Sequence, residues 1–239
     1  MKTGYSGIIF DFNGTLFFDS DKQEESWEII SMRLRGRAFG KQEMQRRMHG
    51  RSGKSIFEYL LERDVPDDEV LRLMAEKEEI YRELCLKDRE RFHLAPGAVE
   101  LLDWIKERRI PRTIATASEI VNVTFFIRSF GLERWFDPEK IVYDDGTLPG
   151  KPNPDIYLKA ARTIGLAPSR CVVVEDRSRP AGRRRIHRGN GFRGDGPCGA
   201  GATGRRRPGD SQFRRFRPKS LNGWRIGSRR ISGRKFTWE

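Results

Sequence analysis

The sequence predicts an α/β fold, a doubly wound parallel sheet with a helical bundle inserted after its first strand. An apolar run at residues 7–10 stops at Asp11 and is followed at once by a turn. Helical periodicity then fills residues 22–88, and strands and helices alternate from residue 97 to residue 175. Such alternation implies right-handed crossovers between parallel strands, so the bundle interrupts a sheet that later residues complete.

Each expected element rests on a local pattern. In the bundle, apolar residues recur at helical spacing around Trp27, Ile56 and Leu73, and Gly50 and Pro66 separate the three segments. In the alternating part we expect helices at residues 97–108, 119–130 and 153–164. We expect the strands that follow these helices at residues 112–116, 140–143 and 171–175.

Positive charge is concentrated at one end of the chain. The formal net charge is +13, yet residues 177–239 hold 19 Lys and Arg against 3 Asp and Glu, while residues 1–176 hold 28 against 31. So basic a segment, with few apolar residues at any period, cannot bury enough surface to offset its chain entropy. We therefore expect a disordered basic tail at residues 177–239, which would leave the strand at residues 171–175 without an outer neighbour.

Cysteine usage and hydropathy exclude several classes of protein. Cys85, Cys171 and Cys198 show no paired spacing, which argues against a disulfide framework and against a zinc site. The apolar run near the start is too short for a membrane span or a signal peptide. We expect a cytoplasmic protein with no membrane partner, and the sequence leaves its oligomeric state open.

Polar residues follow several of the expected strands where each strand ends. Asp11, Thr116 and the pair Glu175 and Asp176 would meet at one edge of a parallel sheet, joined by Lys151 from a Gly/Pro loop. Carboxylates can hold a hard cation such as Mg²⁺, while a hydroxyl and an ammonium bind phosphoryl oxygens. The combination indicates a phosphoryl-transfer site in which Asp11 is the attacking group.

Four segments carry a resemblance to a known family. They are residues 11–16 (Asp-Phe-Asn-Gly-Thr-Leu), 114–118 (Ile-Ala-Thr-Ala-Ser), 150–152 (Gly-Lys-Pro) and 172–176 (Val-Val-Val-Glu-Asp). In this order they resemble the four motifs of the haloacid dehalogenase superfamily. The insert after the first motif is most similar to the β-phosphoglucomutase-like and phosphatase branch, which has a small helical cap. The resemblance covers residues 5–176.

The resemblance implies a domain organisation and an activity. It implies a Rossmann-like core at residues 1–17 and 91–176, a helical cap at residues 18–90, and a tail at residues 177–239 that does not match the family. The implied protein is a Mg²⁺-dependent, phosphatase-like hydrolase of small phosphorylated metabolites, a phosphoric monoester hydrolase that works through an aspartyl-phosphate intermediate. A cap that opens and closes would exclude water and read the leaving group.

The resemblance also implies a role for each matching residue. Asp11 would be the nucleophile and, with Asp176, Glu175 and the backbone carbonyl of Asn13, would bind the metal. Thr116 and Lys151 would hold the phosphate. The expected substrate-binding groups are the backbone amides of Phe12 and Ala117 and the cap side chains of Arg51 and Lys54.

Asn13 departs from the family pattern. The family's phosphatases and mutases carry an aspartate at this position, which protonates the leaving oxygen, and an amide has no proton to give at neutral pH. Because a positioned acid contributes about 10² to 10⁴ in rate, we expect impaired hydrolysis of alkyl phosphates and a smaller effect on acyl or aryl phosphates. Asp21 or Glu24 is an alternative source of the proton.

The tail is the second departure, because the family continues with a helix, a further strand and a closing helix. Plausible codons for residues 186–196, read one base later, spell Tyr-Thr-Ala-Gly-Met-Gly-Phe-Val-Ala-Met, which is similar to the family's sequence after its last motif. We hypothesise that the reading frame changes between about residues 177 and 185, which the nucleotide sequence would test.

Other functions compete with the hydrolase. A catalytically weak, phosphometabolite-binding pseudoenzyme and a sugar-phosphate mutase share the site, and a dehalogenase would need no clamp for phosphate charge. The rival from another class is nucleic-acid or polyanion binding through arginine runs at residues 183–185, 205–207 and 213–217. Such binding is expected to be non-specific.

Overall fold

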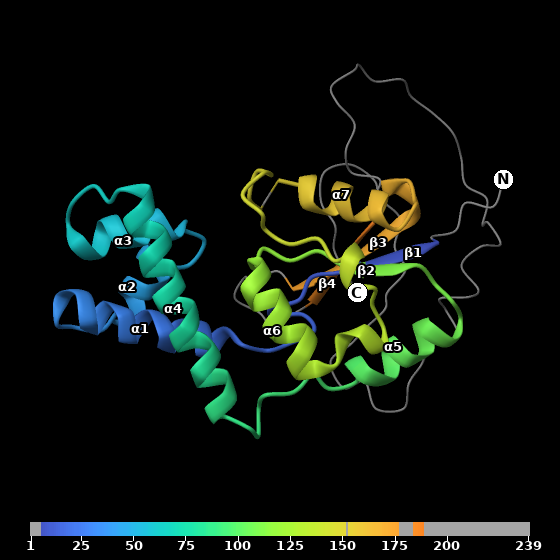
Figure 1. The fold of residues 1–239 in the computed structure, drawn as a ribbon, viewed down its shortest axis with the longest axis horizontal. Helices are drawn as coiled ribbons and strands as arrows, with labels where there is room; N and C mark the ends of the chain where they lie inside the picture. Colours follow the sequence, from blue (N-terminus) through green and yellow to red (C-terminus); the bar gives the residue numbers. More distant parts are fainter. Residues whose placement is uncertain (1–5, 152, 177–183, 189–239) are drawn as a thin grey trace, which may run out of the picture. The chain divides into compact units, whose positions relative to one another are not determined.

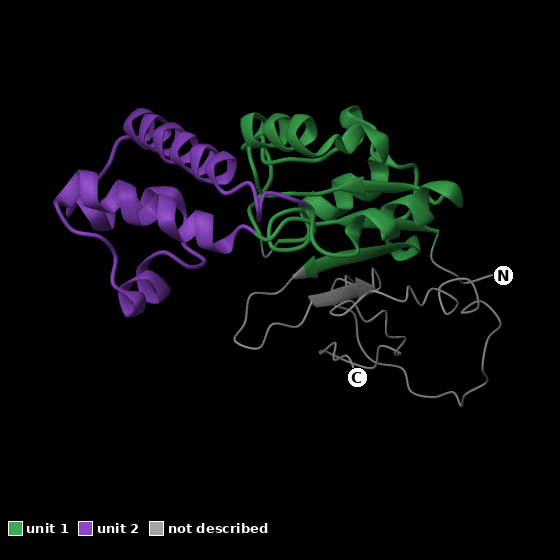
Figure 2. Ribbon diagram, turned by 90° about the horizontal axis from the view of Figure 1, so that it is seen from below, with its two compact units in different colours: residues 1–18, 94–239 green, residues 19–93 purple. Residues whose placement is uncertain are grey.

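The structure is a computed structural model that describes residues 6–151 and 153–176, and the backbone of residues 184–188. Its chain divides into two compact units, Met1–Phe18 with Leu94–Glu239 and Asp19–His93 (Figure 2). The expectations for the rest of the tail and for a change of reading frame fall on residues outside this description. No helix in the described part of the chain combines the length and the apolar character needed to cross a bilayer.

A sheet forms the centre of the first unit. β1 (Gly7–Phe10) pairs in parallel with β2 (Arg112–Ile114) on one side and with β3 (Cys171–Asp176) on the other. Ile9 lies opposite Thr113 in β2 and Val173 in β3. The predicted parallel sheet is therefore confirmed, with the first strand in the middle.

The sheet differs from the prediction at two places. β4 (Arg184–Arg188) pairs antiparallel with β3, so the expectation that β3 lacks an outer neighbour is wrong. The predicted strand at residues 140–143 is also wrong. A 3-10 turn, η2 (Pro138–Lys140), is followed there by one parallel bridge between Ala115 and Val142, because the chain is extended beside β2 only briefly.

Helices cover both faces of the sheet (Figure 1). α7 (Asp155–Thr163) lies on one face, and α5 (Ala98–Glu107) and α6 (Ile120–Phe130) lie on the other. The three helices confirm the predicted ones to within a few residues at each end. The remaining turns are η1 (Leu132–Arg134) and η3 (Pro168–Arg170).

Each face has its own apolar core. On the α7 face, Ile9 and Val173 of the sheet are buried with Ile156 and Ala160 of the helix. On the α6 side, the Phe12 ring stacks on Phe126 with 4.5 Å between the ring centroids. Burial of both faces is the usual requirement for parallel strands. The packed faces fix where the carboxyl ends of β1, β2 and β3 lie.

The second unit is a helical bundle. Its helices are α1 (Ser20–Arg35), α2 (Lys41–Arg47), α3 (Gly53–Leu61) and α4 (Asp67–Lys87). Trp27, Ile30, Phe57 and Leu73 are buried together in its core, and the Trp27 and Phe57 rings lie 5.2 Å apart. Trp27 and Leu73 are among the apolar positions whose spacing predicts these helices.

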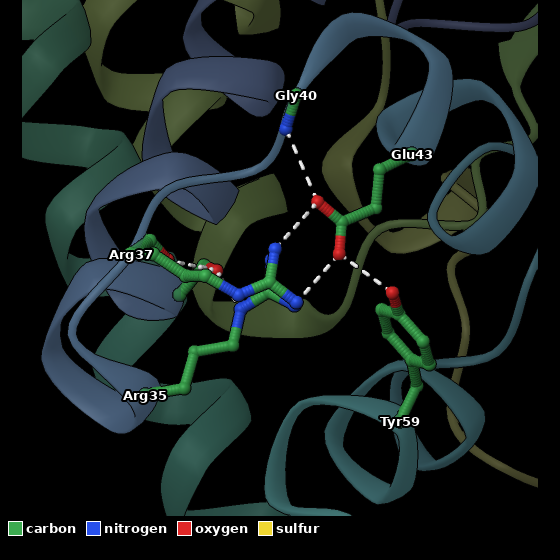
Figure 3. Close-up of polar contacts among 6 residues, drawn as sticks. Arg35, Arg37, Gly40, Glu43 and Tyr59 are labelled. Atoms are coloured by element: carbon green, nitrogen blue, oxygen red, sulfur yellow. Dashed lines mark hydrogen bonds and ion pairs between the residues drawn. The ribbon is translucent and has the colours of Figure 1, made fainter.

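One polar network ties the shortest helix, α2, to its neighbours (Figure 3). The Glu43 carboxylate accepts hydrogen bonds from Arg35 Nη1 at 2.7 Å, from the Tyr59 hydroxyl at 2.6 Å and from the Gly40 backbone N–H at 3.2 Å. Arg37 adds an ion pair at 3.4 Å. The hydrogen bonds from Arg35 first, and then those from Tyr59 and Gly40, lower the pKa of Glu43 to about 2.

Candidate active site

Asp11 stands at the carboxyl end of the central strand. Its backbone N–H donates to the Val174 carbonyl at 2.8 Å, which continues the pairing with β3, and the residue is only 8% exposed. The chain then turns through Gly14, whose φ of 72° lies in the region that glycine adopts without steric cost. The Phe12 carbonyl closes the turn by accepting the Leu16 N–H at 2.8 Å. A carboxylate is thereby fixed in a nearly buried position.

Lys151 contacts that carboxylate across 140 positions of sequence. Its Nζ lies 2.9 Å from Asp11 Oδ1 and 3.8 Å from Glu175 Oε1, and 5.0 Å from the Tyr157 ring centre. Burial raises the pKa of Asp11, the Lys151 ammonium opposes that rise, and the Glu175 charge adds to it. The ammonium therefore pairs with two carboxylates that repel each other.

Two hydroxyls from the end of β2 meet Asn13. Ser118 Oγ donates to Asn13 Oδ1 at 2.8 Å, and Thr116 Oγ1 donates to the same atom at 3.4 Å. The Ser118 N–H donates to Thr116 Oγ1 at 3.1 Å, and the Thr116 N–H donates to the Val142 carbonyl at 3.0 Å. The amide side chain and both hydroxyls are thus oriented by a connected set of hydrogen bonds.

Ser118 was not among the residues predicted for the site. It lies two positions after Thr116, in the turn that follows β2, so a second hydroxyl in the same turn was the available clue. Serine in a turn is so often a local cap that the clue is weak.

The predicted backbone donors have different surroundings. The Phe12 backbone N–H acts to lower the pKa of the adjacent Asp11 carboxylate. Ala117 lies exposed between Thr116 and Ser118. The roles of both amides in holding a substrate stay predictions.

The residues predicted from the bundle lie in the other unit. Lys54 Nζ pairs with Asp67 at 2.8 Å, and Arg51 is exposed just before α3. Their part in substrate binding stays a prediction. The alternative proton sources are held in ion pairs of that unit, Asp21 with Arg91 at 2.9 Å and Glu24 with His49 at 3.1 Å.

The side chains around Lys151 offer oxygen donors for a metal ion. Within the described side chains, no three Asp, Glu, His or Cys residues gather in one group. Asp176 ends β3, but its side chain lies outside the description. Asp11 and Glu175 nevertheless face one ammonium and interact unfavourably with each other, and all their donor atoms are oxygens. Such a set of oxygen donors fits a hard cation such as Mg²⁺. It does not resemble the nitrogen and sulfur donor sets typical of zinc or copper sites.

Comparison with known proteins gives the family. The model of the haloacid dehalogenase-like hydrolases matches residues 5–179. Hexitol phosphatase A of Escherichia coli is 31% identical over 74% of this chain and 76% of its own length, and β-phosphoglucomutase of Bacillus subtilis is 28% identical over 71% and 74%. A crystal structure of a haloacid dehalogenase hydrolase, family IA, variant 3, from Entamoeba histolytica has 39% identity and a TM-score of 0.69, covering 72% of this chain and 76% of that one.

The match covers the four sequence motifs, both units of the structure and the turn that presents Asp11. The chain therefore belongs to the haloacid dehalogenase-like hydrolases, in their β-phosphoglucomutase-like and phosphatase branch, as a phosphoric monoester hydrolase.

Proposed function

We propose that this protein hydrolyses monoesters of small phosphorylated metabolites, phosphorylated sugars and sugar alcohols first, with Asp11 as the nucleophile. One observation carries the proposal: a carboxylate that is only 8% exposed ends the central strand and lies 2.9 Å from the Lys151 ammonium. Hexitol phosphatase A and a phosphorylated carbohydrates phosphatase of Thermotoga maritima, which is 29% identical, support this class of substrate.

The reaction would proceed in two displacements at phosphorus. An Asp11 carboxylate oxygen attacks phosphorus, the bond from phosphorus to the ester oxygen breaks, and the alkoxide leaves with the bonding electron pair and takes a proton from water to become the alcohol. Water then attacks the phosphorus of the aspartyl phosphate, which releases inorganic phosphate and restores the carboxylate. Each step only exchanges the oxygen bonded to phosphorus, so no oxidant or reductant is required.

Lys151 has two tasks in this scheme. Its ammonium opposes the rise that burial causes in the pKa of Asp11 and thereby favours the ionised, nucleophilic form of the carboxylate. The same ammonium supplies positive charge where the negative charge of the transferring phosphoryl group would lie. Thr116 and Ser118 supply hydroxyls at the same edge of the sheet.

Magnesium would be held by Asp11, Glu175, Asp176 and the backbone carbonyl of Asn13. When bound, Mg²⁺ supplies positive charge that offsets repulsion between a phosphate dianion and the carboxylates. The chain's own residues provide the oxygen donors and keep the carboxylates close together. We expect the full chain to lose phosphatase activity in a chelator and to recover it when Mg²⁺ is restored.

Asn13 favours a second candidate, a protein that binds phosphometabolites but turns them over slowly. Its Oδ1 accepts from two hydroxyls, and the amide carries no acidic proton. In this candidate the leaving alkoxide would receive its proton from water. Aryl phosphates would then be hydrolysed faster than alkyl phosphates, because their leaving groups need no proton.

The experiment is release of inorganic phosphate from an aryl phosphate and from hexose and hexitol phosphates by the full chain with Mg²⁺. Asp11→Asn should lower kcat by about 10³ or more, because the amide cannot attack phosphorus as the carboxylate does. Asp68→Asn, the same change on an exposed residue of α4, is the control and should leave kcat unchanged. Equal rates for Asp11→Asn and the unsubstituted chain would overturn the proposal.

A further inference from the structure

A basic pocket lies at the amino edge of the sheet, opposite to the candidate active site. Its volume is about 600 Å³, and its lining includes Lys106, Arg109, Arg112, Trp135 and Lys140. All of these residues belong to the Leu94–Glu239 part of the first unit. Arg112 begins β2 and Thr116 follows its other end, so the two sites are separated by roughly 13 Å of strand.

Positive charge in this pocket is poorly compensated. Asp137, the acidic residue of the lining, pairs with Lys140 at 2.9 Å. Across the described residues, Lys106, Arg109 and Arg112 have no carboxylate within ion-pair distance. Cations gathered without counter-charges repel one another, and an anion in the pocket would remove that repulsion.

The Arg112 guanidinium supplies a second, independent observation. Its Nη1 donates to the Ile110 carbonyl at 3.1 Å, whereas its buried Nε has no hydrogen-bond partner among the described residues. Burial also lowers the pKa of Arg112, through the loss of water around its charge. Buried donors are nearly always satisfied in folded proteins, so this one leaves the Arg112 cation under-compensated beside the pocket, where an anion would offset it.

Arg109 is held in an unusual backbone conformation beside the pocket. It follows Arg108, the C-cap residue of α5, with a φ of 51°, at a position where glycine is the common choice. A side chain at such a position carries a steric cost, and this one adds an exposed guanidinium to the basic pocket. The local strain therefore favours a use for the side chain.

We propose that the basic pocket binds a small anion that carries a phosphoryl group, at a site separate from the candidate active site. Guanidinium groups bind phosphoryl oxygens through charge-assisted hydrogen bonds, and the volume admits a molecule of the size of pyrophosphate or a hexose phosphate. The proposal does not depend on the proposed function, because it involves none of the residues at the carboxyl edge.

Binding of inorganic pyrophosphate, measured by calorimetry on the full chain at about 0.15 M salt, tests the proposal. The background variant Lys151→Ala removes the ammonium of the candidate active site. In that background Arg109→Gln should weaken binding by about tenfold, the effect of losing one charge-assisted hydrogen bond. Binding is also measured in the chain that keeps Lys151, with and without Arg109→Gln, as a control for a folding defect caused by Lys151→Ala.

Arg108→Gln is the matched control. Arg108 is the neighbouring residue, it lies over the Trp104 ring at 4.2 Å, and it is not part of the pocket lining. Both variants lose one positive charge, so any pyrophosphate bound by the basic residues 177–239 is affected equally. Binding that is absent from the Lys151→Ala chain, or that Arg108→Gln and Arg109→Gln change to the same extent, would overturn the proposal.

A gain of affinity provides a test that damage to the fold cannot mimic. Asp137→Asn keeps a side-chain oxygen for the Glu139 N–H but removes the carboxylate that neutralises Lys140. Pyrophosphate binding should become about threefold tighter, and weaker binding would contradict the proposal. A parallel titration with a hexose phosphate distinguishes an inorganic ligand from a phosphate ester, since both should respond to Arg109→Gln but with different affinities.

Discussion

At the scale of single residues, we expect Asn13 to limit how fast an alkyl phosphate reacts. Its Oδ1 accepts hydrogen bonds from Ser118 and Thr116, and an aspartate of the same shape could accept both. Asn13→Asp should therefore preserve the local geometry while adding a group that can carry a proton. Asn and Asp differ at this position only by an amide in place of a carboxyl group, so the substitution tests the role of the proton.

We predict that Asn13→Asp raises kcat/KM for a hexitol phosphate by about 10² to 10⁴, the usual contribution of a positioned general acid. An aryl phosphate should gain much less, because its leaving group needs no proton. Phosphate release from both substrates gives the ratio of kcat/KM for the hexitol phosphate to kcat/KM for the aryl phosphate. Gln45→Glu, which makes the same amide-to-acid change at an exposed residue of α2, is the control, and an unchanged ratio for Asn13→Asp would contradict this account.

The sequence predicts some residues of the candidate site but not all of the contacts between them. Asp11, Thr116, Lys151 and Glu175 follow predicted strands or loops, and the structure brings Asp11, Lys151 and Glu175 within ion-pair distance. Their catalytic roles stay predictions. The contact between Ser118 and Asn13 could not be foreseen, because it depends on the rotation of two side chains in separate turns.

At the scale of elements, the Glu43 network fixes α2 in the helical bundle. The Glu43 carboxylate joins the end of α1 to α3 through Arg35 and Tyr59, and its side chain is 17% exposed. A helix of seven residues has little stability of its own. Its position therefore depends on these contacts and on buried Met44.

We predict that Glu43→Gln lowers the free energy of unfolding by about 2 kcal/mol at neutral pH, through loss of charge-assisted hydrogen bonds. The folded pKa of about 2 lies below the ordinary value of 4.5, so the ionised carboxylate stabilises the fold above pH 4.5. That contribution is lost as the pH falls toward 2. Urea unfolding at several pH values should show that the unfolding free energies of Glu43→Gln and of the unsubstituted chain become more similar as the pH falls.

Glu79→Gln, at an exposed residue of α4, is the matched control for this measurement and should change the unfolding free energy by less than about 0.5 kcal/mol. A difference between Glu43→Gln and the unsubstituted chain that stays constant from neutral pH to pH 3 would show that the carboxylate charge is not responsible.

Two elements show where pattern reading fails. Residues 140–143 contain an apolar pair, Ile141 and Val142, but only Val142 forms a bridge, to Ala115, since the segment starts in a 3-10 turn. β4 is missed for the opposite reason. Its sequence is mostly arginine, while strand pairing uses backbone groups that composition does not reveal.

At the scale of the whole molecule, the family match, the sheet and the basic part of the sequence end at different residues. The family match stops at residue 179, β4 lies beyond it, and the basic residues continue to residue 239. β4 pairs with β3 through five residues from Val172 to Asp176. Pairing at this edge covers backbone groups of β3 that would otherwise be open to other chains.

We predict that a chain ending at Arg188 keeps the phosphatase activity and loses most of its affinity for heparin, because the polyanion binds through basic residues beyond β4. A chain ending at Asp176 should also lose about 2 kcal/mol of unfolding free energy, through loss of the β3 to β4 hydrogen bonds. Thermal unfolding of the two truncated chains makes the comparison. Equal unfolding temperatures would show that β4 contributes nothing to stability.

The central claim is that Asp11 becomes phosphorylated during turnover, and its most direct test is mass spectrometry of the enzyme after an acid quench. During hydrolysis of an aryl phosphate with Mg²⁺, the peptide that contains Asp11 should carry a phosphoryl group that hydroxylamine removes. The same peptide from Asp11→Asn should carry none. Steady release of phosphate with no phosphorylated Asp11 peptide at any quench time would contradict the account.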